Sequence, residues 1–261
     1  MFDWYGRTHR EMVLDLLPRD WAFQGKRILD FGCGPGALMR YFVDEAAVAS
    51  SYACDIHEPS IAWLQQHLSP PFNVSVNSPV PPLPLPDGHF DLVLALEVLT
   101  VMADHWSDWL VELHRLLDPN GVIIATVAGA RMAEAISGHP WDDARTGMNV
   151  FGHGEWSPTV IHSPWWISSH WGRIFSVNLD RGECPCGHDV VLLRKKRRIC
   201  TPAELEEPDP LEPREAMAMS EQLRQFRHEL MDGFEQRQVL RAQIQELGSG
   251  AAPPCLARPG P

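Results

Sequence analysis

The sequence predicts a doubly wound α/β domain with a mostly parallel seven-stranded sheet, followed by a separate helical tail. Three observations lead to this fold class. Apolar runs alternate with amphipathic helical stretches over most of the chain. A glycine-rich turn follows the first apolar run, as in open α/β sheets that bind a ligand. The last part has the composition of one long helix. The predicted divisions are a domain at 1–199, a linker at 200–213, a helix at 214–247 and a disordered tail at 248–261.

Composition narrows the function. A chain of 261 residues with 44% hydrophobic side chains can form one large domain and an appendage. Its formal net charge of -12 argues against nucleic acid as the partner, because phosphate binding needs clustered Lys and Arg. No apolar run reaches the roughly 18 residues of a membrane span, and the N-terminus lacks a basic and then apolar signal segment. We therefore expect a cytoplasmic protein without a membrane span.

The elements follow from hydrophobic periodicity, taken in chain order. Arg7–Leu17 has apolar residues at helical spacing and ends before Pro18, so a first helix is expected there. Five apolar runs then predict the strands Arg27–Phe31, Ser51–Asp55, Asn73–Val76, Phe90–Leu96 and Gly121–Val127. The segments between them predict crossover helices at Gly36–Glu45, Pro59–Leu68 and Ser107–Leu117. Helical crossovers join parallel strands in a right-handed sense, which gives the parallel sheet.

The remainder of the domain is less regular. Residues 128–163 are rich in Trp, His, Gly and Pro and are expected to form a lid over the acceptor site. Ser163 and Pro164 have the pattern of an N-cap and a first helical residue, so a short helix should run to Trp171. The strands Ile174–Leu179 and Asp189–Arg194 are expected to close the sheet.

A ligand site is predicted where the first strand meets its glycine-rich turn. The run from Asp30 to Gly36 reads Asp-Phe-Gly-Cys-Gly-Pro-Gly, and its glycines let the backbone approach a ligand closely. The run also satisfies the dinucleotide fingerprint, so a nicotinamide cofactor stays open. Asp30, however, suits a ligand with an ammonium group better than a pyrophosphate. Asp55, about twenty residues further on, is placed to accept ribose hydroxyls in either case.

Four ordered motifs resemble those of the class I S-adenosylmethionine-dependent methyltransferases. They are Ile28 to Gly36, Tyr52 to Ile56, Leu83 to Val93 and Leu113 to Gly121. The resemblance implies a Rossmann-like fold with S-adenosylmethionine as cofactor. It places Tyr5 over the cofactor; Asp30, Gly32, Cys33, Gly34 and Gly36 at its methionine part; Asp55 and Ile56 at the ribose; Asn77 at the adenine; and Glu97 at the methyl group. The chain departs from many relatives in having Thr100 and Val101 where they have a histidine.

A catalytic base must therefore come from elsewhere, if one is used. Methyl transfer depends on holding donor and acceptor in line, and a base serves mainly to deprotonate a hydroxyl. Position relative to the carboxyl edge of the sheet selects three of the twelve histidines, His139, His153 and His162. Each could instead be a packed, hydrogen-bonded side chain. His105 stays open without a supporting feature.

No metal is expected. The six cysteines show no disulfide framework, and thiols should be reduced in the cytosol. The run Cys184-Pro185-Cys186-Gly187-His188 resembles a metal knuckle, but its spacing and the absence of a second ligand pair favour a hairpin turn.

The function predicted from these observations is metal-free O-methylation of a hydroxylated small molecule or glycan. Two alternatives remain, a non-catalytic scaffold that acts through its C-terminal helix and an NAD-dependent oxidoreductase. In the helix at 214–247 a heptad seam is formed by Leu223, Phe226, Leu230, Leu240, Ile244 and Leu247. The helix could therefore form a coiled coil in a homo-oligomer, bind a partner protein or pack back on the domain.

Overall fold

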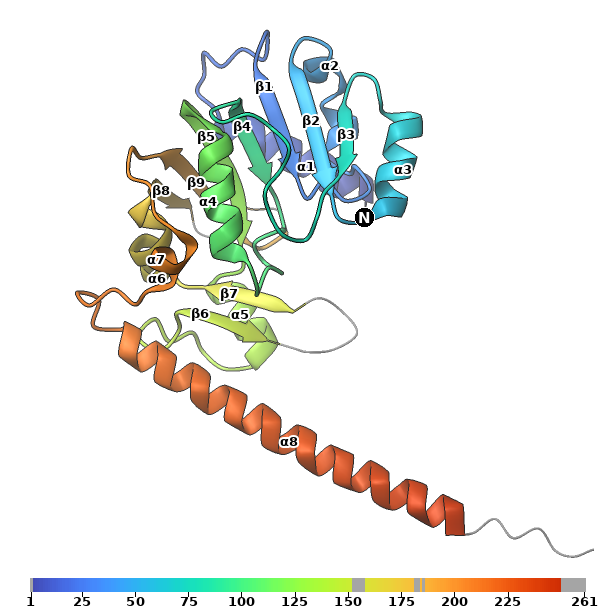
Figure 1. Ribbon diagram of the computed structural model, residues 1–261, viewed down its shortest axis with the longest axis vertical. Coiled ribbons are helices and arrows are strands. Elements are labelled where there is room, and N and C mark those ends of the chain that lie inside the picture. Colours follow the sequence, from blue (N-terminus) through green and yellow to red (C-terminus); the bar gives the residue numbers. More distant parts are fainter. Residues whose placement is uncertain (1, 152–157, 181–183, 185, 250–261) are drawn as a thin grey trace, which may run out of the picture.

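The computed structural model describes residues 2–151, 158–180, 184 and 186–249 and shows the predicted doubly wound sheet (Figure 1). Its seven strands lie in the order β3-β2-β1-β4-β5-β9-β8. Their bounds are β1 (Arg27–Phe31), β2 (Ser50–Asp55), β3 (Asn73–Val76), β4 (Phe90–Ala95), β5 (Leu117–Val127), β8 (Phe175–Asp180) and β9 (Asp189–Lys195). The first five are parallel, and β9 runs antiparallel to both β5 and β8. All seven predicted strands are confirmed.

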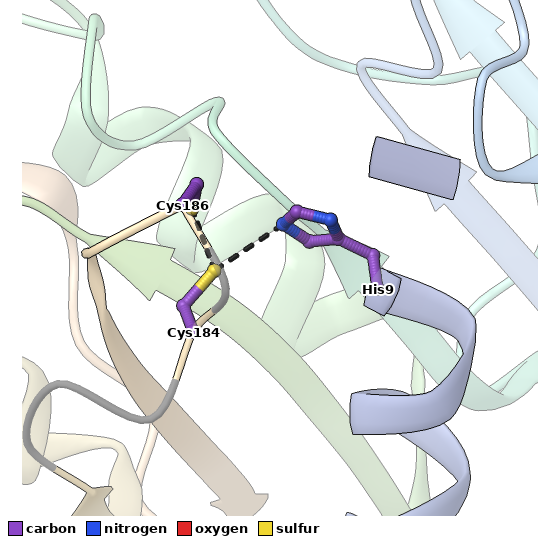
Figure 2. A group of neighbouring side chains, drawn as sticks. All are labelled: His9, Cys184 and Cys186. Carbon is purple, nitrogen blue, oxygen red and sulfur yellow. Dashed lines mark hydrogen bonds between the residues drawn. The ribbon is translucent and has the colours of Figure 1, made fainter. Parts of the chain in front are cut away.

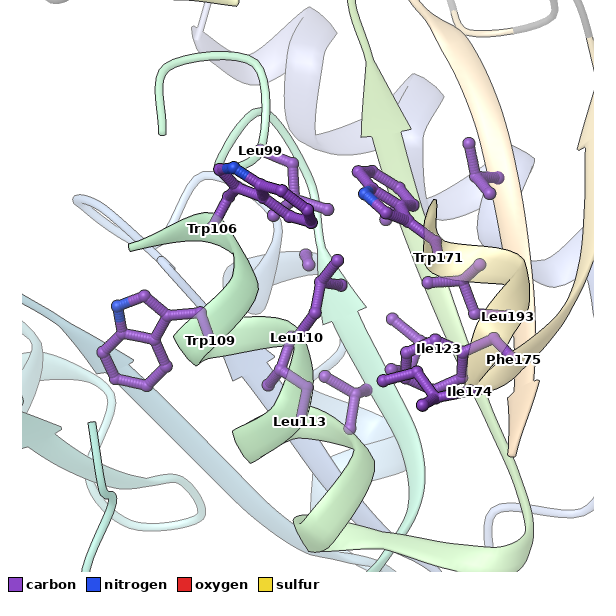
Figure 3. Packing of buried hydrophobic residues seen from close by; sticks show 14 of the residues in the cluster. Leu99, Trp106, Trp109, Leu110, Leu113, Ile123, Trp171, Ile174, Phe175 and Leu193 are labelled. Carbon is purple, nitrogen blue, oxygen red and sulfur yellow. The ribbon is translucent and has the colours of Figure 1, made fainter. Parts of the chain in front are cut away.

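Two apolar layers cover the sheet because side chains alternate between its faces. One layer joins Leu29, Ile123 and Leu193 to helix α4 (Trp106–Leu116), whose Trp109, Leu110 and Leu113 are fully buried (Figure 3). The other layer joins Ile28, Leu94 and Ile124 to α1 (Phe2–Leu16) and α3 (Glu58–His67). The central strands are mostly apolar since both faces are covered.

The single helix predicted at Gly36–Glu45 is wrong. This segment forms a short 3-10 helix, η1 (Met39–Tyr41), and one turn of α2 (Val43–Ala46), with Phe42 between them outside helical geometry. The helix α1 begins at Phe2 instead of Arg7, and its extra turn packs against this segment. A Cβ added to Gly6 would lie 2.0 Å from the carbonyl oxygen of Ala37, so the two backbones are in contact.

The strand β5 also begins four residues earlier than predicted. Phe90 pairs with Leu117 and Leu92 with Val122, which leaves the four residues 118–121 in a bulge opposite Asp91. The sequence predicted a turn between the helix that ends at Leu117 and the strand that begins at Gly121, because Asp, Pro and Asn favour turns.

The described parts of the predicted lid, residues 128–151 and 158–163, form regular elements. These are α5 (Ala130–Ser137) and the antiparallel pair β6 (Met148–Phe151) and β7 (Thr159–His162). The Val160 N–H donates to the carbonyl of Thr100 and the His162 N–H to that of Ala128, so β7 is fixed to the carboxyl edge of the sheet. The predicted helix follows as α6 (Pro164–His170), with the Ser163 hydroxyl capping the Trp166 N–H, and leads into η2 (Trp171–Arg173).

The region predicted as a linker contains a docked helix, α7 (Pro202–Glu206), which begins with a capping box of Thr201 and Glu204. Leu205 is fully buried beneath α4, and the Ser107 hydroxyl donates to Glu206. The segment rich in proline and acidic residues thus contains a short helix, α7, whose Leu205 completes the core.

The long helix α8 (Glu215–Ser249) follows the domain, and only its beginning packs back on it. Its first turns pack on the domain, where Ala218 is buried and Glu215 accepts a hydrogen bond from His170 Nε2. Beyond them the helix projects away from the domain (Figure 1). Within the described residues, no helix has both the length and the apolar character needed to cross a bilayer.

Candidate functional site

A cavity of about 550 Å³ opens at the carboxyl ends of β1, β2 and β4, the edge at which doubly wound sheets bind ligands. One side is formed by Gly32, Asp55, Ile56 and Asn77. The other side comes from Glu97 and the loop that follows β4. The lining residues of that loop and its surroundings are Val98, Val101, Met102, Ala103, Asp104, His105, Trp109 and Pro158.

The glycine-rich turn needs its glycines for two different reasons. Gly32, Gly34 and Gly36 all have positive φ, at 75°, 50° and 76°, where other residues are strained. A Cβ on Gly32 would meet Val98 at 2.2 Å, and one on Gly36 would meet Leu64 at 2.4 Å. A Cβ on Gly34 would have no described atom within 4 Å. Packing therefore requires Gly32 and Gly36, whereas Gly34 leaves open space beside the cavity.

Asp55 is held firmly at the end of β2. Its Oδ2 accepts the Gly34 N–H at 2.7 Å, and its Oδ1 accepts the His57 N–H at 2.8 Å. Each carboxylate oxygen keeps a further lone pair, so Asp55 can accept two hydroxyl groups as well.

Asn77, across the cavity, offers an acceptor. Its Nδ2 donates to the carbonyl of Ser78, whereas its Oδ1 is buried with no partner in the described part of the chain. A buried amide oxygen without a hydrogen bond costs free energy, so a donor from a ligand would be favoured there. The next lining residue, Ile56, is exposed and offers an apolar surface.

Asp30, Tyr5 and Cys33 are not among the residues that line the cavity. Burial, together with the nearby Asp55 carboxylate, raises the pKa of Asp30 to about 7. The Tyr5 ring stacks on His9 at 3.8 Å, and burial raises its pKa far above the usual value. Burial likewise raises the pKa of the Cys33 thiol, which packs into the core. Cys33 therefore contributes backbone to the turn and no nucleophile.

Glu97 has an unusual backbone. Its φ is 59°, and its N–H donates to the Thr126 hydroxyl at 2.7 Å. Strain of this kind at a non-glycine residue is common at functional sites because surrounding structure must hold it. Here it sets the carboxylate at the cavity rim, 3.7 Å from His188 Nδ1.

The structure does not bring His139 or His162, two of the three predicted base candidates, into the cavity. His162 is 1% exposed, lies between the rings of Trp166 and Trp171, and has a pKa lowered to about 3 by burial. His139 is exposed beyond the end of α5 and is not a lining residue. His153 lies outside the described residues. The geometry gives neither His139 nor His162 support as a base.

His105, which the sequence left open, is the histidine that lines the cavity. It occupies the N-cap position of α4 with φ of 60°, and its Nδ1 lies 2.9 Å from Asp108 Oδ2. A carboxylate bound to Nδ1–H leaves Nε2 as a proton acceptor. The signal in the sequence was its place in the loop after the fourth strand, at the carboxyl edge.

Next to the cavity rim, the structure brings His9, which the sequence did not connect with them, to Cys184 and Cys186 (Figure 2). His9 from α1 approaches Cys184, with Nε2 and Sγ 3.2 Å apart. Cys184 and Cys186 have their sulfurs 2.6 Å apart, and His188 Nδ1 is 3.2 Å from Cys186 Sγ. These are residue types that bind transition metals.

Comparisons with known proteins find methyltransferases. Residues 29–125 match the family model described as a methyltransferase domain. A malonyl-[acyl-carrier protein] O-methyltransferase of Enterobacter lignolyticus is 31% identical over 126 residues, 48% of each chain. Phthiotriol/phenolphthiotriol dimycocerosates methyltransferase 1 of Mycobacterium ulcerans is 31% identical over 102 residues, 39% of this chain and 37% of that one. The chain thus spans at most about half the length of these relatives.

Solved structures support the fold. The PH0226 protein of Pyrococcus horikoshii superposes with a TM-score of 0.55 at 15% identity, covering 73% of this chain and 89% of that one. An S-adenosylmethionine-dependent methyltransferase of Methanosarcina mazei gives 0.52 at 16% identity, with 70% and 96% covered. The matched family model ends at residue 125, so the lid, α7 and α8 lie outside it.

Proposed function

Residues 29–125 form a methyltransferase domain of the class I S-adenosylmethionine-dependent family, and on this basis we propose that the chain O-methylates a hydroxylated small molecule or glycan. The observation that supports the proposal is the continuity of one cavity. Its glycine, Asp55 and Asn77 side adjoins an apolar wall that ends at His105. Donor and acceptor could therefore lie side by side in a single space.

The residues present fit the cofactor. Open space at Gly34 admits a ligand against the backbone, Asp55 can accept two ribose hydroxyls, and the free Oδ1 of Asn77 can accept an exocyclic amine. Asp30 supplies a buried carboxylate close to the turn, which suits an ammonium group. S-adenosylmethionine supplies an electrophilic methyl group on a sulfonium, and its transfer needs an in-line approach of the acceptor.

The chain's own residues would hold and deprotonate the acceptor. Val98, Val101, Met102 and Trp109 form a wall that binds an apolar or ring-shaped body and excludes water. His105 would accept the hydroxyl proton at Nε2 while Asp108 holds the ring through Nδ1.

The charge of the cavity favours a neutral acceptor. Its described lining includes Asp55, Glu97 and Asp104 but neither Lys nor Arg. Three of the similar proteins, that of Enterobacter lignolyticus among them, are named for a malonyl acceptor, which is an acid and would be repelled by these carboxylates. The same negative lining disfavours a dinucleotide pyrophosphate, and with it the oxidoreductase alternative.

Calorimetric titration with S-adenosylmethionine, S-adenosylhomocysteine and NAD tests the cofactor. We expect the two sulfur nucleosides to bind, Asp55→Ala to weaken them, and NAD not to bind. Binding of NAD alone would refute the proposal.

Transfer of labelled methyl groups to a panel of phenols, sugars and malonyl thioesters tests the acceptor. A phenol or sugar should be methylated, and His105→Asn, which tolerates the positive φ, should lower kcat by about 100-fold. The matched change His139→Asn should leave kcat unchanged. Methylation of malonyl thioesters only would contradict the neutral acceptor.

We also propose that the projecting part of α8 pairs with a second copy of the chain. Leu223, Leu230, Leu240 and Ile244 are each more than half exposed and fall on the heptad seam. Exposed apolar side chains at this spacing are typical of a coiled-coil interface.

A further inference from the structure

The cluster beside the cavity rim combines distant parts of the chain. His9 lies on α1, whereas Cys184, Cys186 and His188 lie in the loop between β8 and β9, 175 residues from His9 to Cys184. His9 and Cys184 are almost fully buried. Two thiols and two imidazoles, two of these side chains buried and two partly buried, therefore lie together, and these are the ligand types that zinc prefers.

The loop that presents the cysteines is a tight turn. The Gly187 N–H donates to the Cys184 carbonyl at 2.9 Å, the Cys184 N–H donates to the His188 carbonyl at 3.3 Å, and Gly187 has φ of 87°. A hairpin turn at these residues was expected from the sequence, where it counted against metal binding. In the structure the turn is what sets both thiols toward His9, which supplies the second part of a ligand set.

The orientation of His9 supports a ligand role. Its Nδ1–H donates to the Tyr5 carbonyl at 2.7 Å, so Nε2 carries the lone pair and faces Cys184 Sγ. A backbone carbonyl that fixes the imidazole through its other nitrogen is the usual outer partner of a zinc-bound histidine. Glu97, 3.7 Å from His188 Nδ1, lies beside the second histidine.

The ligand atoms lie slightly closer together than they would around a zinc ion. In a tetrahedral Cys2His2 zinc site, bond lengths of about 2.3 Å to sulfur and about 2.05 Å to nitrogen give ligand separations of about 3.8 and 3.6 Å. Here the sulfurs are 2.6 Å apart, and each sulfur is 3.2 Å from its histidine. The ligand atoms of His9, Cys184 and Cys186 all lie within 4.8 Å of one another, and those of Cys186, His188 and Glu97 form a second such group. The two groups share Cys186, so an ion held by the first three ligands would need small outward shifts of the thiols and a movement of His188 toward it.

We propose that His9, Cys184, Cys186 and His188 bind one zinc ion, which ties α1 to the β8–β9 loop at the rim of the cofactor cavity. Four protein ligands leave no open position, so the site is structural. The zinc would hold in place the turn of α1 that contains Tyr5, and it would fix His188 beside Glu97. It takes no part in the methyl transfer proposed above and does not depend on it.

Metal analysis of the full-length chain tests the proposal directly. After purification in buffer with zinc and removal of free metal, elemental analysis should find about one zinc ion per chain. Cobalt should give the visible and near-ultraviolet absorption of a tetrahedral thiolate site. Cys184→Ser and His9→Gln should each lose the ion, whereas Cys200→Ser, at another buried cysteine, and His67→Gln, at an exposed histidine, should retain it.

A second measurement covers variants that fail to fold. A strong chelator should remove the zinc from the unaltered chain, and added zinc should restore both the metal content and the melting temperature. His9→Cys, which keeps a ligand at this position, should still bind about one ion. A chain without zinc and without the cobalt absorption would overturn the proposal. So would peptide mass analysis that finds a Cys184–Cys186 disulfide in the chain as purified.

Both results are read without any methyl transfer. Zinc in a chain that fails to bind S-adenosylmethionine would leave the metal site standing and refute only the function. A metal-free chain with full transferase activity would refute the metal site and leave the proposed function standing.

Discussion

Asp30 should be destabilising in the ligand-free protein, and Asp30→Asn should therefore make it more stable. The folded-state pKa of about 7 lies above the ordinary 3.8, so the folded state holds a proton that the unfolded state has lost. Stability should fall as pH rises between these two values and level off above 7. The total loss in the free energy of unfolding is about 4 kcal/mol. Asparagine is neutral at every pH, so the Asp30→Asn chain should not show this loss.

Denaturant unfolding of the ligand-free chain, followed by tryptophan fluorescence from pH 5.5 to 8.5, measures this difference. The advantage of Asp30→Asn should grow by about 1.4 kcal/mol per pH unit up to neutrality and then stay constant. Asp20→Asn, at an exposed carboxyl, should shift stability by less than about 0.5 kcal/mol at every pH. An Asp30→Asn chain that is less stable than the original at pH 8 would refute the reasoning.

Asp30→Asn should also weaken the binding of the cofactor. Removing one partner of a buried charge pair costs about 2 kcal/mol or more, so S-adenosylmethionine should bind at least about 30-fold less tightly. In the unaltered chain its affinity should drop as pH falls below 7, because the proton on Asp30 must leave first. Calorimetry in buffers of different ionisation enthalpy should detect that released proton, and an affinity independent of pH would count against the pairing.

Three further outcomes follow from the fold. Gly34→Ala and Gly88→Ala, both at positive φ with open surroundings, should each lower the free energy of unfolding by about 1 kcal/mol. Only Gly34→Ala should weaken the binding of S-adenosylmethionine in calorimetry. Leu205→Ala, which empties a buried position under α4, should cost about 2–5 kcal/mol, against less than about 0.5 for the exposed Ile199→Ala; equal losses would show that α7 is not docked. A chain ending at Gln222 keeps the docked turns of α8 and should be monomeric in light scattering with unchanged turnover, while a full-length chain that is also monomeric would rule out pairing through α8.

The local sequence was sufficient for most of the fold. Runs such as Phe90–Ala95 are short and mostly apolar, which is typical of a covered parallel strand, and short apolar runs predicted all seven strands. The positions of Gly34, Asp55 and Asn77 at strand ends were likewise predictable, because parallel strands bring their carboxyl ends to one edge. Where the prediction failed, as at Gly36–Glu45, contact with α1 overrode local helical preference.

Side-chain direction and long-range proximity were decided by tertiary structure alone. His105 and His162 both follow strands toward the same edge, yet one lines the cavity and the other is buried among tryptophans, since packing sets where each side chain points. The spacing of Cys184, Cys186 and His188 could not reveal a fourth ligand, because His9 reaches them only when α1 packs across the sheet. The sequence by itself therefore determined the strands, the glycine turn and the cofactor class. The identity of the nearest base and the gathering of two thiols and two imidazoles depend on contacts between residues far apart in the chain, for which no local pattern exists.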